Sequence, residues 1–313
     1  MTEANKALYS SYMANCVFNA FLSYTAIMLN SVTIYATRKT SSLPKPLKIL
    51  LLSLAVSDLG VGLLVQPLHI ARFVMEVEPN AEDNPTYKTL FSVYLILVNL
   101  FYYASFFGVT ALCVDRFLAI HLHLRYQELV THTRVVAVAI SIWVFGASLS
   151  LIGLLAARRD KYIVFATIEV FCLITTALLY CKIYLAVRHH ANQIHALQVQ
   201  LDAQNGEMAN AARLRKSAIG TFYVYLVFLF CYLPTNCFHF ATFNSGWSTN
   251  VKIFASYTAT LVFLNSSLNP LIYCWKLRQI RHTVMDILRK IVPWKESGPP
   301  VQFIAVTCEA NVI

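Results

Sequence analysis

The sequence predicts an all-α membrane protein, a seven-transmembrane helix bundle with a short amphipathic cytoplasmic helix after the seventh span. First, 58% of the 313 residues are hydrophobic and only 13% are charged, so a soluble fold could not cover its surface with polar groups. Second, the apolar residues gather into seven segments, each long enough to cross a hydrocarbon core of roughly 30 Å. Third, the basic residues collect in alternate connections between those segments.

A polar, turn-rich or charged break follows each segment. The uncharged run of the third segment lies between Lys88 and Asp115. These charges are expected at the membrane edges, because a charge in mid-membrane costs roughly 2.5–3.5 kcal/mol on insertion scales. The pattern predicts a transmembrane domain over residues 13–275, after a short extracellular N-terminus at 1–12. The seven spans cover approximately residues 13–37, 47–73, 88–119, 132–156, 161–188, 216–243 and 250–275.

The basic residues also set the expected orientation. Eighteen Lys and Arg residues fall on one side of the seven spans and seven on the other. Because short cytoplasmic loops carry the excess of positive charge, we expect an extracellular N-terminus, a cytoplasmic C-terminus and a multi-pass protein of the plasma membrane. Topology thus explains the net charge of +10, and no nucleic-acid partner is needed.

Two further segments are expected on the cytoplasmic side. Residues 276–291 place apolar side chains at helical spacing between basic ones, which predicts an amphipathic helix on the anionic inner leaflet. The connection at 189–215 is rich in helix formers, so the fifth and sixth spans should extend into the cytoplasm. Residues 292–313 are expected to form a disordered tail.

Asp58 is the clearest ionisable residue inside a span, and such residues are functional candidates. Its carboxylate needs polar partners or a cation, and hard oxygen ligands suit a small hard cation such as sodium. A satisfied buried carboxyl that only stiffens the bundle is the other reading, and the residues alone leave both open. The candidate partners are Asn30, Ser105, Asn265, Ser266 and Asn269.

Glu169 lies in the outer half of the fifth span, where an unpaired acid is expensive. It is therefore expected to face the bundle interior or a water-filled cavity. Polar residues at comparable depth in other spans could line a ligand pocket with it, although they could equally bond helix to helix. They are His69, Asn99, Asn236 and His239.

No motif for catalysis is present. The eight cysteines form no CxxC pair and show no metal-ligand spacing, and nothing supports a hydrolase or a kinase. The start of the chain has no cleavable signal pattern. Pro234 and Pro270 each remove one backbone hydrogen bond from a spanning helix and should kink it.

A set of short motifs occurs in order, one per span. They are Asn30, LAVSD ending at Asp58, Asp115-Arg116-Phe117, Trp143, Tyr180, Phe228-x-x-Cys231-x-x-Pro234 and Asn269-Pro270-x-x-Tyr273. This set resembles the rhodopsin-like (class A) G-protein-coupled receptors over about residues 13–291. A seven-helix channel or transporter that uses Asp58 and Glu169 is the rival outside this class, but it would need internal repeats, and none is found.

The resemblance implies a role for each matching residue. Arg116 would engage a heterotrimeric G protein when the sixth helix swings outward, and Tyr180 and Tyr273 would stabilise that open state. Asn30 and Trp143 would be structural, and an unknown extracellular ligand would bind in the outer half. The family's allosteric sodium pocket matches Asp58, Ser105, Asn265, Ser266 and Asn269, which favours the sodium reading. The remaining switch residues are Asp115, Phe117, Phe228, Tyr232, Pro234, Asn269 and Pro270.

Departures from the family pattern narrow the resemblance. The outer disulfide and the proline of the fifth span are absent, and the second outer loop is very short. These three features together resemble the melanocortin receptors, which belong to a cluster with the adenosine, cannabinoid and lysophospholipid receptors. An adenosine-like or lipid-binding receptor is the alternative, because the acids that melanocortin receptors use are replaced by Leu68, Phe91 and Leu95. Val98 stands where amine receptors place an aspartate, which argues against a biogenic amine.

Two sequence features concern signalling. Leu214 stands where many family members place an acid that restrains the arginine, so a raised basal activity is predicted. Ser297 and Thr307 are the only hydroxyls past residue 292, so recruitment of arrestin through the tail is expected to be weak.

Overall fold

The computed structural model describes residues 3–41, 43–78, 80–122, 125–155, 158–198, 205–245, 248–276 and 278–291. Over these ranges the chain is helical and contains no strand. The helices are α1 (Glu3–Lys39), α2 (Lys45–Gly60), α3 (Gln66–Glu76), α4 (Pro85–His121), α5 (Tyr126–Leu129), α6 (His132–Leu155), α7 (Arg158–Gln198), α8 (Asn205–Ser245), α9 (Thr249–Lys276) and α10 (Arg278–Ile291). A π-helix, η1 (Val61–Val65), joins α2 to α3, and a 3-10 turn, η2 (Ala81–Asp83), precedes α4.

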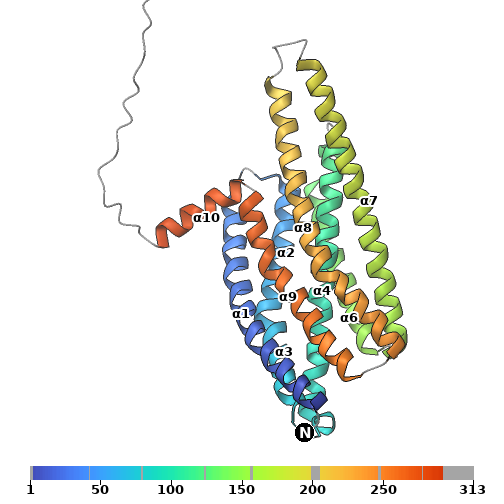
Figure 1. Ribbon diagram of the computed structural model, residues 1–313. Coiled ribbons are helices and arrows are strands. Elements are labelled where there is room, and N and C mark those ends of the chain that lie inside the picture. Colours follow the sequence, from blue (N-terminus) through green and yellow to red (C-terminus); the bar gives the residue numbers. More distant parts are fainter. Residues whose placement is uncertain are drawn as a thin grey trace, which may run out of the picture.

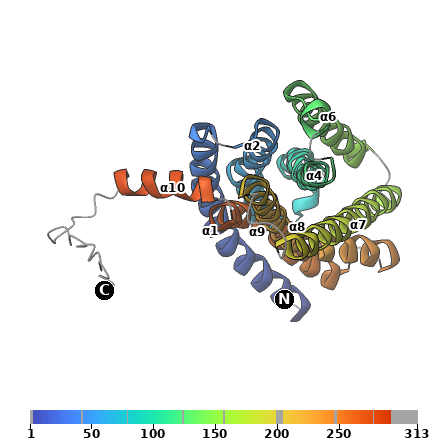
Figure 2. The same cartoon turned by 90° about the horizontal axis from the view of Figure 1, so that it is seen from above.

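The long helices run side by side as one bundle (Figure 1), and α4 packs against α2, α6, α7 and α8 (Figure 2). Among the described residues, six helical segments are long and apolar enough to cross a membrane. α9 completes the bundle as a helix of 28 residues, and it is more polar because Asn265, Ser266 and Asn269 lie buried in its middle. The predicted seven-helix bundle is therefore confirmed.

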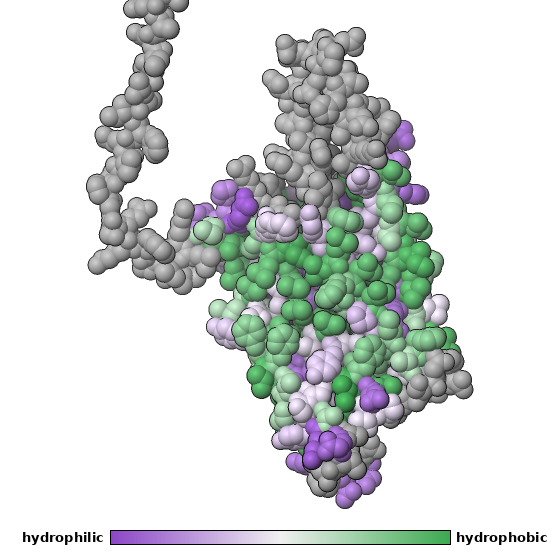
Figure 3. Space-filling model, in the orientation of Figure 1, coloured by the Kyte–Doolittle hydropathy of each residue, from purple (hydrophilic) through white to green (hydrophobic). Residues whose placement is uncertain are grey.

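The middle of the bundle carries an apolar surface. Figure 3 shows a hydrophobic belt around the visible face, with hydrophilic residues gathered toward the two ends. The exposed side chains of this belt include Val144, Phe171, Phe230 and Phe240. Because exposed apolar area of this extent is unfavourable in water, the belt fits the hydrocarbon region of a bilayer.

The first helix begins ten residues earlier than the predicted span. α1 starts at Glu3, so most of the expected N-terminal segment 1–12 is helical. Glu3, Lys6 and Ser10 of this segment are exposed, but Ser11 is buried 3.5 Å from the Ser256 hydroxyl of α9, and the polar contacts with α9 continue along α1. The Asn15 amide donates to the Ser256 hydroxyl (3.2 Å), and the Asn19 amide donates to the Thr260 hydroxyl (2.9 Å).

The second span is interrupted by the π-helix. Gln66 donates its backbone N–H to the carbonyl of Val61, and the following residue, Pro67, has no N–H to offer. The Gly62 carbonyl instead accepts a hydrogen bond from the Ser23 hydroxyl of α1 (2.8 Å). The proline and the hydroxyl of a neighbouring helix together make the local change in winding stable.

The end of the bundle opposite the N-terminus agrees with the predictions. α7 and α8 continue beyond the other helices at this end (Figure 1), as expected from the helix formers in their connection. α10 projects sideways from the bundle and carries the predicted amphipathic pattern (Figures 1 and 2). Its Ile280 is fully buried against the bundle core. The predicted tail at 292–313 lies outside the described residues.

Candidate functional site

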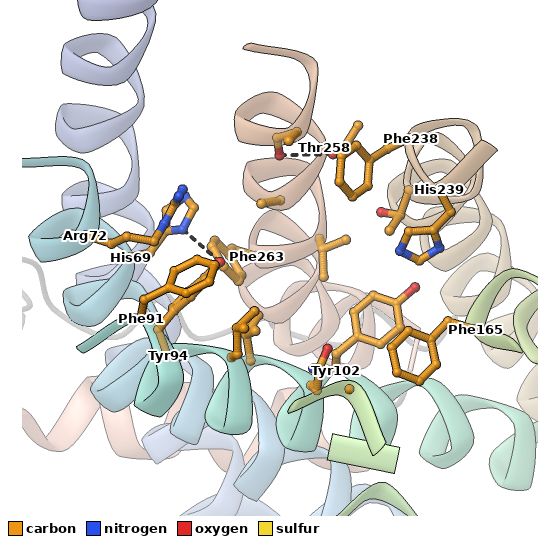
Figure 4. A pocket seen from close by; sticks show the side chains of 18 of the residues that line it. His69, Arg72, Phe91, Tyr94, Tyr102, Phe165, Phe238, His239, Thr258 and Phe263 are labelled. Atoms are coloured by element: carbon orange, nitrogen blue, oxygen red, sulfur yellow. Dashed lines mark hydrogen bonds between the residues drawn. The ribbon is translucent and has the colours of Figure 1, made fainter. Parts of the chain in front are cut away.

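A cavity of about 230 Å³ opens into the N-terminal half of the bundle, between side chains of α1, α3, α4, α6, α7, α8 and α9 (Figure 4). This is the end predicted to face the outside. Aromatic rings form much of its wall, and a small number of charged groups interrupt them, which is the usual make-up of a small-molecule site. The aromatic lining residues are Tyr12, Phe91, Tyr94, Tyr102, Tyr103, Phe165, Phe238 and Phe263.

Most of the predicted pocket residues line this cavity. They are His69, Val98, Asn99, Glu169 and His239, and they come from four helices. Asn236 is the predicted member that does not line it. Thr235, Phe238 and His239 share the cavity face of α8, and a residue one position after Thr235 is turned by about 100° away from that face.

One side of the cavity carries a cluster of charges on α3, α9 and α1. Arg72 pairs with Glu76 (2.7 Å), Lys252 lies 3.7 Å from the same carboxylate, and the Tyr12 hydroxyl donates to it (3.0 Å). This cluster was not predicted from the sequence, because charged residues near helix ends are common. The spacing of His69, Arg72 and Glu76 on one helical face was the signal that could have revealed it.

The other side of the cavity carries Glu169 and His239. The Glu169 side chain is fully buried, and one of its oxygens lies 3.6 Å from Nδ1 of His239. Figure 4 shows His239 and Phe165 at the opposite side of the cavity from His69 and Arg72. The two sides of the cavity therefore differ: on one side Arg72 and Lys252 are paired with Glu76, and on the other side lies the buried acid Glu169.

An aromatic stack leads from the cavity into the middle of the bundle. The ring of Tyr102, which lines the cavity, lies 4.9 Å from Tyr232 on α8, and Tyr232 stacks on Phe228 at 4.2 Å. Tyr232 and Phe228 are almost completely buried. Pro234 lies inside α8 next to this stack. A change in the cavity wall can therefore reach the interior through packed rings.

Asp58 belongs to a layer of polar side chains that lies next to the cavity, toward the C-terminal end of α4; its partner Ser105 follows the cavity-lining residues of that helix. Its carboxylate accepts hydrogen bonds from the Ser105 hydroxyl (3.2 Å) and the Asn269 amide (2.9 Å). Within the described chain, the side-chain oxygens of Asn265 and Asn269 are buried without a hydrogen-bond partner. Asn30 donates to the backbone carbonyl of Ser266 (2.8 Å), which fastens α1 to this layer.

Arg116 of the third span lies at the end of α4 opposite the cavity, where it is held away from solvent. Arg116 is only 4% exposed, and its guanidinium forms a hydrogen-bonded ion pair with Asp115. Tyr126 of α5 donates to the other Asp115 oxygen (2.6 Å). Burial and the nearby Asp115 charge raise the pKa of Tyr126, so this phenol remains a donor at neutral pH. The pairing of Arg116 with the adjacent Asp115 is expected from the sequence, whereas α5 and the hydrogen bond from Tyr126 were not predicted.

The remaining switch residues lie around the same end. Tyr180 stacks on Tyr225 (4.9 Å), Phe117 stacks on His121 (5.3 Å), and the Tyr273 hydroxyl is buried with no partner in the described part of the chain. Pro270 follows Asn269 inside α9, which continues past it as a helix.

Farther from the switch, Trp143 donates to the Ser53 hydroxyl (3.1 Å) and so ties α6 to α2, as a structural role requires. The seven cysteines described are all free. The side chain of Leu214, and the tail with Ser297 and Thr307, lie outside the described residues.

Comparisons with known proteins point in one direction. The model of the family "7 transmembrane receptor (rhodopsin family)" matches residues 29–162 and 156–273. The dog adenosine receptors A2a and A3 (Canis lupus familiaris) are 24% and 25% identical, over 91% and 92% of this chain and 75% and 95% of their own length. Melanocortin receptor 5 of Bos taurus is 26% identical over 85% of this chain and 82% of its own.

These relatives are receptors and not enzymes, and they belong to the cluster that the sequence motifs indicated. The family match spans five of the seven predicted transmembrane segments in full, most of the seventh and the last part of the first. The bundle, the apolar belt and the residues of the motifs agree with that match. The chain therefore belongs to the rhodopsin family of seven-transmembrane receptors.

Proposed function

We propose that this protein is a plasma-membrane receptor that binds an extracellular ligand in the cavity and activates heterotrimeric G proteins at the opposite end. The observation that carries this proposal is the course of α4. Its first half lines the cavity with Phe91, Tyr94 and Tyr102, and its last turns carry the buried Arg116. One rigid helix thus connects a ligand site to a cation that must be released before a partner can contact it.

The switch requires two states that the ligand distinguishes. In the closed state, Asp115 and Tyr126 hold Arg116 away from solvent. A ligand that moves Tyr102 against Tyr232 would shift α8 through the stack with Phe228. Outward movement of α8 would open space for a G protein, and the unpartnered hydroxyl of Tyr273 would gain a polar contact there.

The orientation of the receptor follows from charge. The excess of Lys and Arg in the loops on the α10 side supports a cytoplasmic location for that side. The cavity then opens to the outside, and α10 rests its apolar face on the inner leaflet. Arrestin would bind on the same cytoplasmic side, and the paucity of tail hydroxyls predicts a weak contribution from the tail.

The decisive experiment measures ligand-free activation of each Gα class in cells, at matched surface expression. Arg116→Ala is expected to lower the basal signal at least about fivefold, which lies within the usual range of coupling between sites. Arg38→Ala, at the exposed end of α1, is the matched control and should signal like wild type. An unchanged signal in Arg116→Ala would refute the coupling role, and a silent wild type would refute the predicted high basal activity.

The Asp58 layer supports a further part of this proposal, an allosteric sodium ion. Asp58, Ser105, Asn265, Ser266 and Asn269 would hold it, and the two unpartnered amide oxygens are ligands of the hardness that sodium requires. When bound, the ion would supply the positive charge that a fully buried carboxylate lacks. Sodium would then favour the closed state, because the contacts of Asp58 with Ser105 and Asn269 occur in the state in which Arg116 is paired with Asp115.

Sodium binding predicts a specific change in stability. At a concentration about ten times its Kd, the ion should raise the free energy of unfolding by about 1.4 kcal/mol. The measurement compares thermal unfolding of the purified receptor in sodium chloride and in choline chloride at about 0.15 M ionic strength. Asp58→Asn should remove the difference between the two salts. Equal stability of the wild type in both salts would exclude the ion.

A further inference from the structure

Glu169 is an unsatisfied acid in the wall of the cavity. Its side chain is 0% exposed, and neither carboxylate oxygen accepts a hydrogen bond from any residue that the structure describes. His239 Nδ1, at 3.6 Å, is too far for a hydrogen bond. An isolated buried carboxylate costs several kcal/mol unless a partner compensates it. Within the described residues, Glu169 thus has His239 and the Tyr102 hydroxyl nearby but accepts no hydrogen bond of normal geometry.

The Arg and Lys side chains that line the cavity do not compensate Glu169. Arg72 and Lys252 are engaged by Glu76 on the other side of the cavity, and Figure 4 shows Arg72 across the cavity from His239. A ligand that enters between the two sides would leave the Arg72 cluster intact. The carboxyl group of Glu169, which accepts no hydrogen bond in the described part of the chain, is thus a group that a ligand can satisfy.

Aromatic rings surround this acid. Tyr103 lies 5.6 Å from Phe165 and 5.0 Å from Tyr102, measured between ring centroids, and all three residues line the cavity with Glu169. The Tyr102 hydroxyl is also buried without a hydrogen-bond partner in the described ranges. A carboxylate beside several ring faces is the arrangement that binds an organic ammonium group, through charge and cation–π attraction.

We propose that the ligand is a small organic cation, a protonated amine on an apolar or aromatic body, and that its ammonium group binds Glu169. This inference rests on the proposed receptor function and names the ligand class of the same cavity. The acid comes from α7, so Val98 on α4 does not exclude an amine, contrary to the expectation from its position. A ligand that is an anion would leave Glu169 uncompensated, and the volume of about 230 Å³ favours a small molecule.

The test uses the purified full-length receptor and matched probes at neutral pH. The probes are phenylalkylamines from benzylamine to 4-phenylbutylamine, each paired with the alcohol of the same chain length. In wild type, at least one amine should raise the unfolding temperature by about 3 °C or more, and its alcohol should not. Equal shifts by amine and alcohol, or no shift with any amine, would overturn the proposal without the use of any variant.

Glu169→Gln provides the second arm. It keeps the shape of the side chain and removes the charge, so the unliganded variant should be at least as stable as wild type, while the amine shift should disappear. Asp83→Asn, an exposed acid near the mouth of the bundle, is the matched control and should retain the shift. Retention of the shift in Glu169→Gln would refute the role of the carboxylate.

This result is separable from the proposed function. Arg116→Ala should bind the amine as wild type does, because Arg116 lies at the opposite end of α4 from the cavity. A receptor that binds amines but activates no G protein would contradict the proposed coupling alone. A receptor that signals but binds no amine would contradict the ligand class alone, including the case in which a protonated His239 already compensates Glu169.

Discussion

Replacement of Gly60 by alanine is expected to lower the free energy of unfolding by about 2–3 kcal/mol, as overpacked cores typically do. A methyl group on Gly60 would lie 2.2 Å from Cε1 of Phe101, far inside van der Waals contact. Phe101 cannot easily move, because it is 8% exposed and packs edge-on against Trp143 with ring centroids 5.9 Å apart. The π-helix begins at the next residue, so a shift there would also disturb α3.

Thermal unfolding of the purified receptor would measure this loss. Gly108→Ala is the matched control, because its added methyl would meet only Leu54 Cδ1, at 3.4 Å, and alanine favours the helix by up to about 1 kcal/mol. A double variant, Gly60→Ala with Phe101→Leu, should recover part of the stability. If Gly60→Ala were as stable as Gly108→Ala, the close packing of α2 on α4 would be wrong.

Thr260→Val should lower the free energy of unfolding by about 1.5–2 kcal/mol, because it removes a hydroxyl from a buried network without a change in shape. That hydroxyl donates to Asn15 Oδ1 (2.6 Å) and accepts from the Asn19 amide (2.9 Å). Interhelical hydrogen bonds in membranes average about 0.6 kcal/mol, but here one loss leaves two asparagines with weakened partners.

Thr242→Val is the control for this prediction. Thr242 is also buried in a spanning helix, and its hydroxyl donates to a backbone carbonyl of the same helix, that of Phe238 (2.9 Å). Its replacement should cost much less than that of Thr260. Thermal unfolding of both variants decides the question, and equal losses would mean that the contact between α1 and α9 contributes little to stability.

The lengths of the spans could be predicted because the bilayer dictates them. The third and fourth spans were expected at 88–119 and 132–156, and the helices run over Pro85–His121 and His132–Leu155. The start of α1 could not be predicted, since a polar residue such as Ser11 looks like part of a loop until its partner, Ser256, is known. Contacts between the two ends of a chain leave no local pattern.

The residues of the candidate site could be predicted where a polar or charged side chain lies inside a membrane span, because its burial there costs free energy. Asp58, Glu169 and His239 stood out because polar groups inside a membrane require a reason. Arg72 and Lys252 gave no such signal, because cations near helix ends are common. Asn236 was selected because it lies at the same membrane depth as the other pocket residues, but it does not line the cavity. Depth alone does not identify a pocket residue, since a step of one residue along a helix changes the direction in which the side chain points.

The hydrogen bonds between α1 and α9 also have a consequence for synthesis in the cell. Asn19 and its partner Thr260 are 241 residues apart in the chain, so about 10–50 s of translation separate them at 5–20 residues per second. During that interval the first helix is already inserted, and Asn15 and Asn19 can use only the hydrogen bonds to their own helix backbone. We therefore expect an insertase or chaperone to shield this polar face of α1 until α9 is inserted. The contact between the first and the last helix of the bundle then forms at the end of assembly.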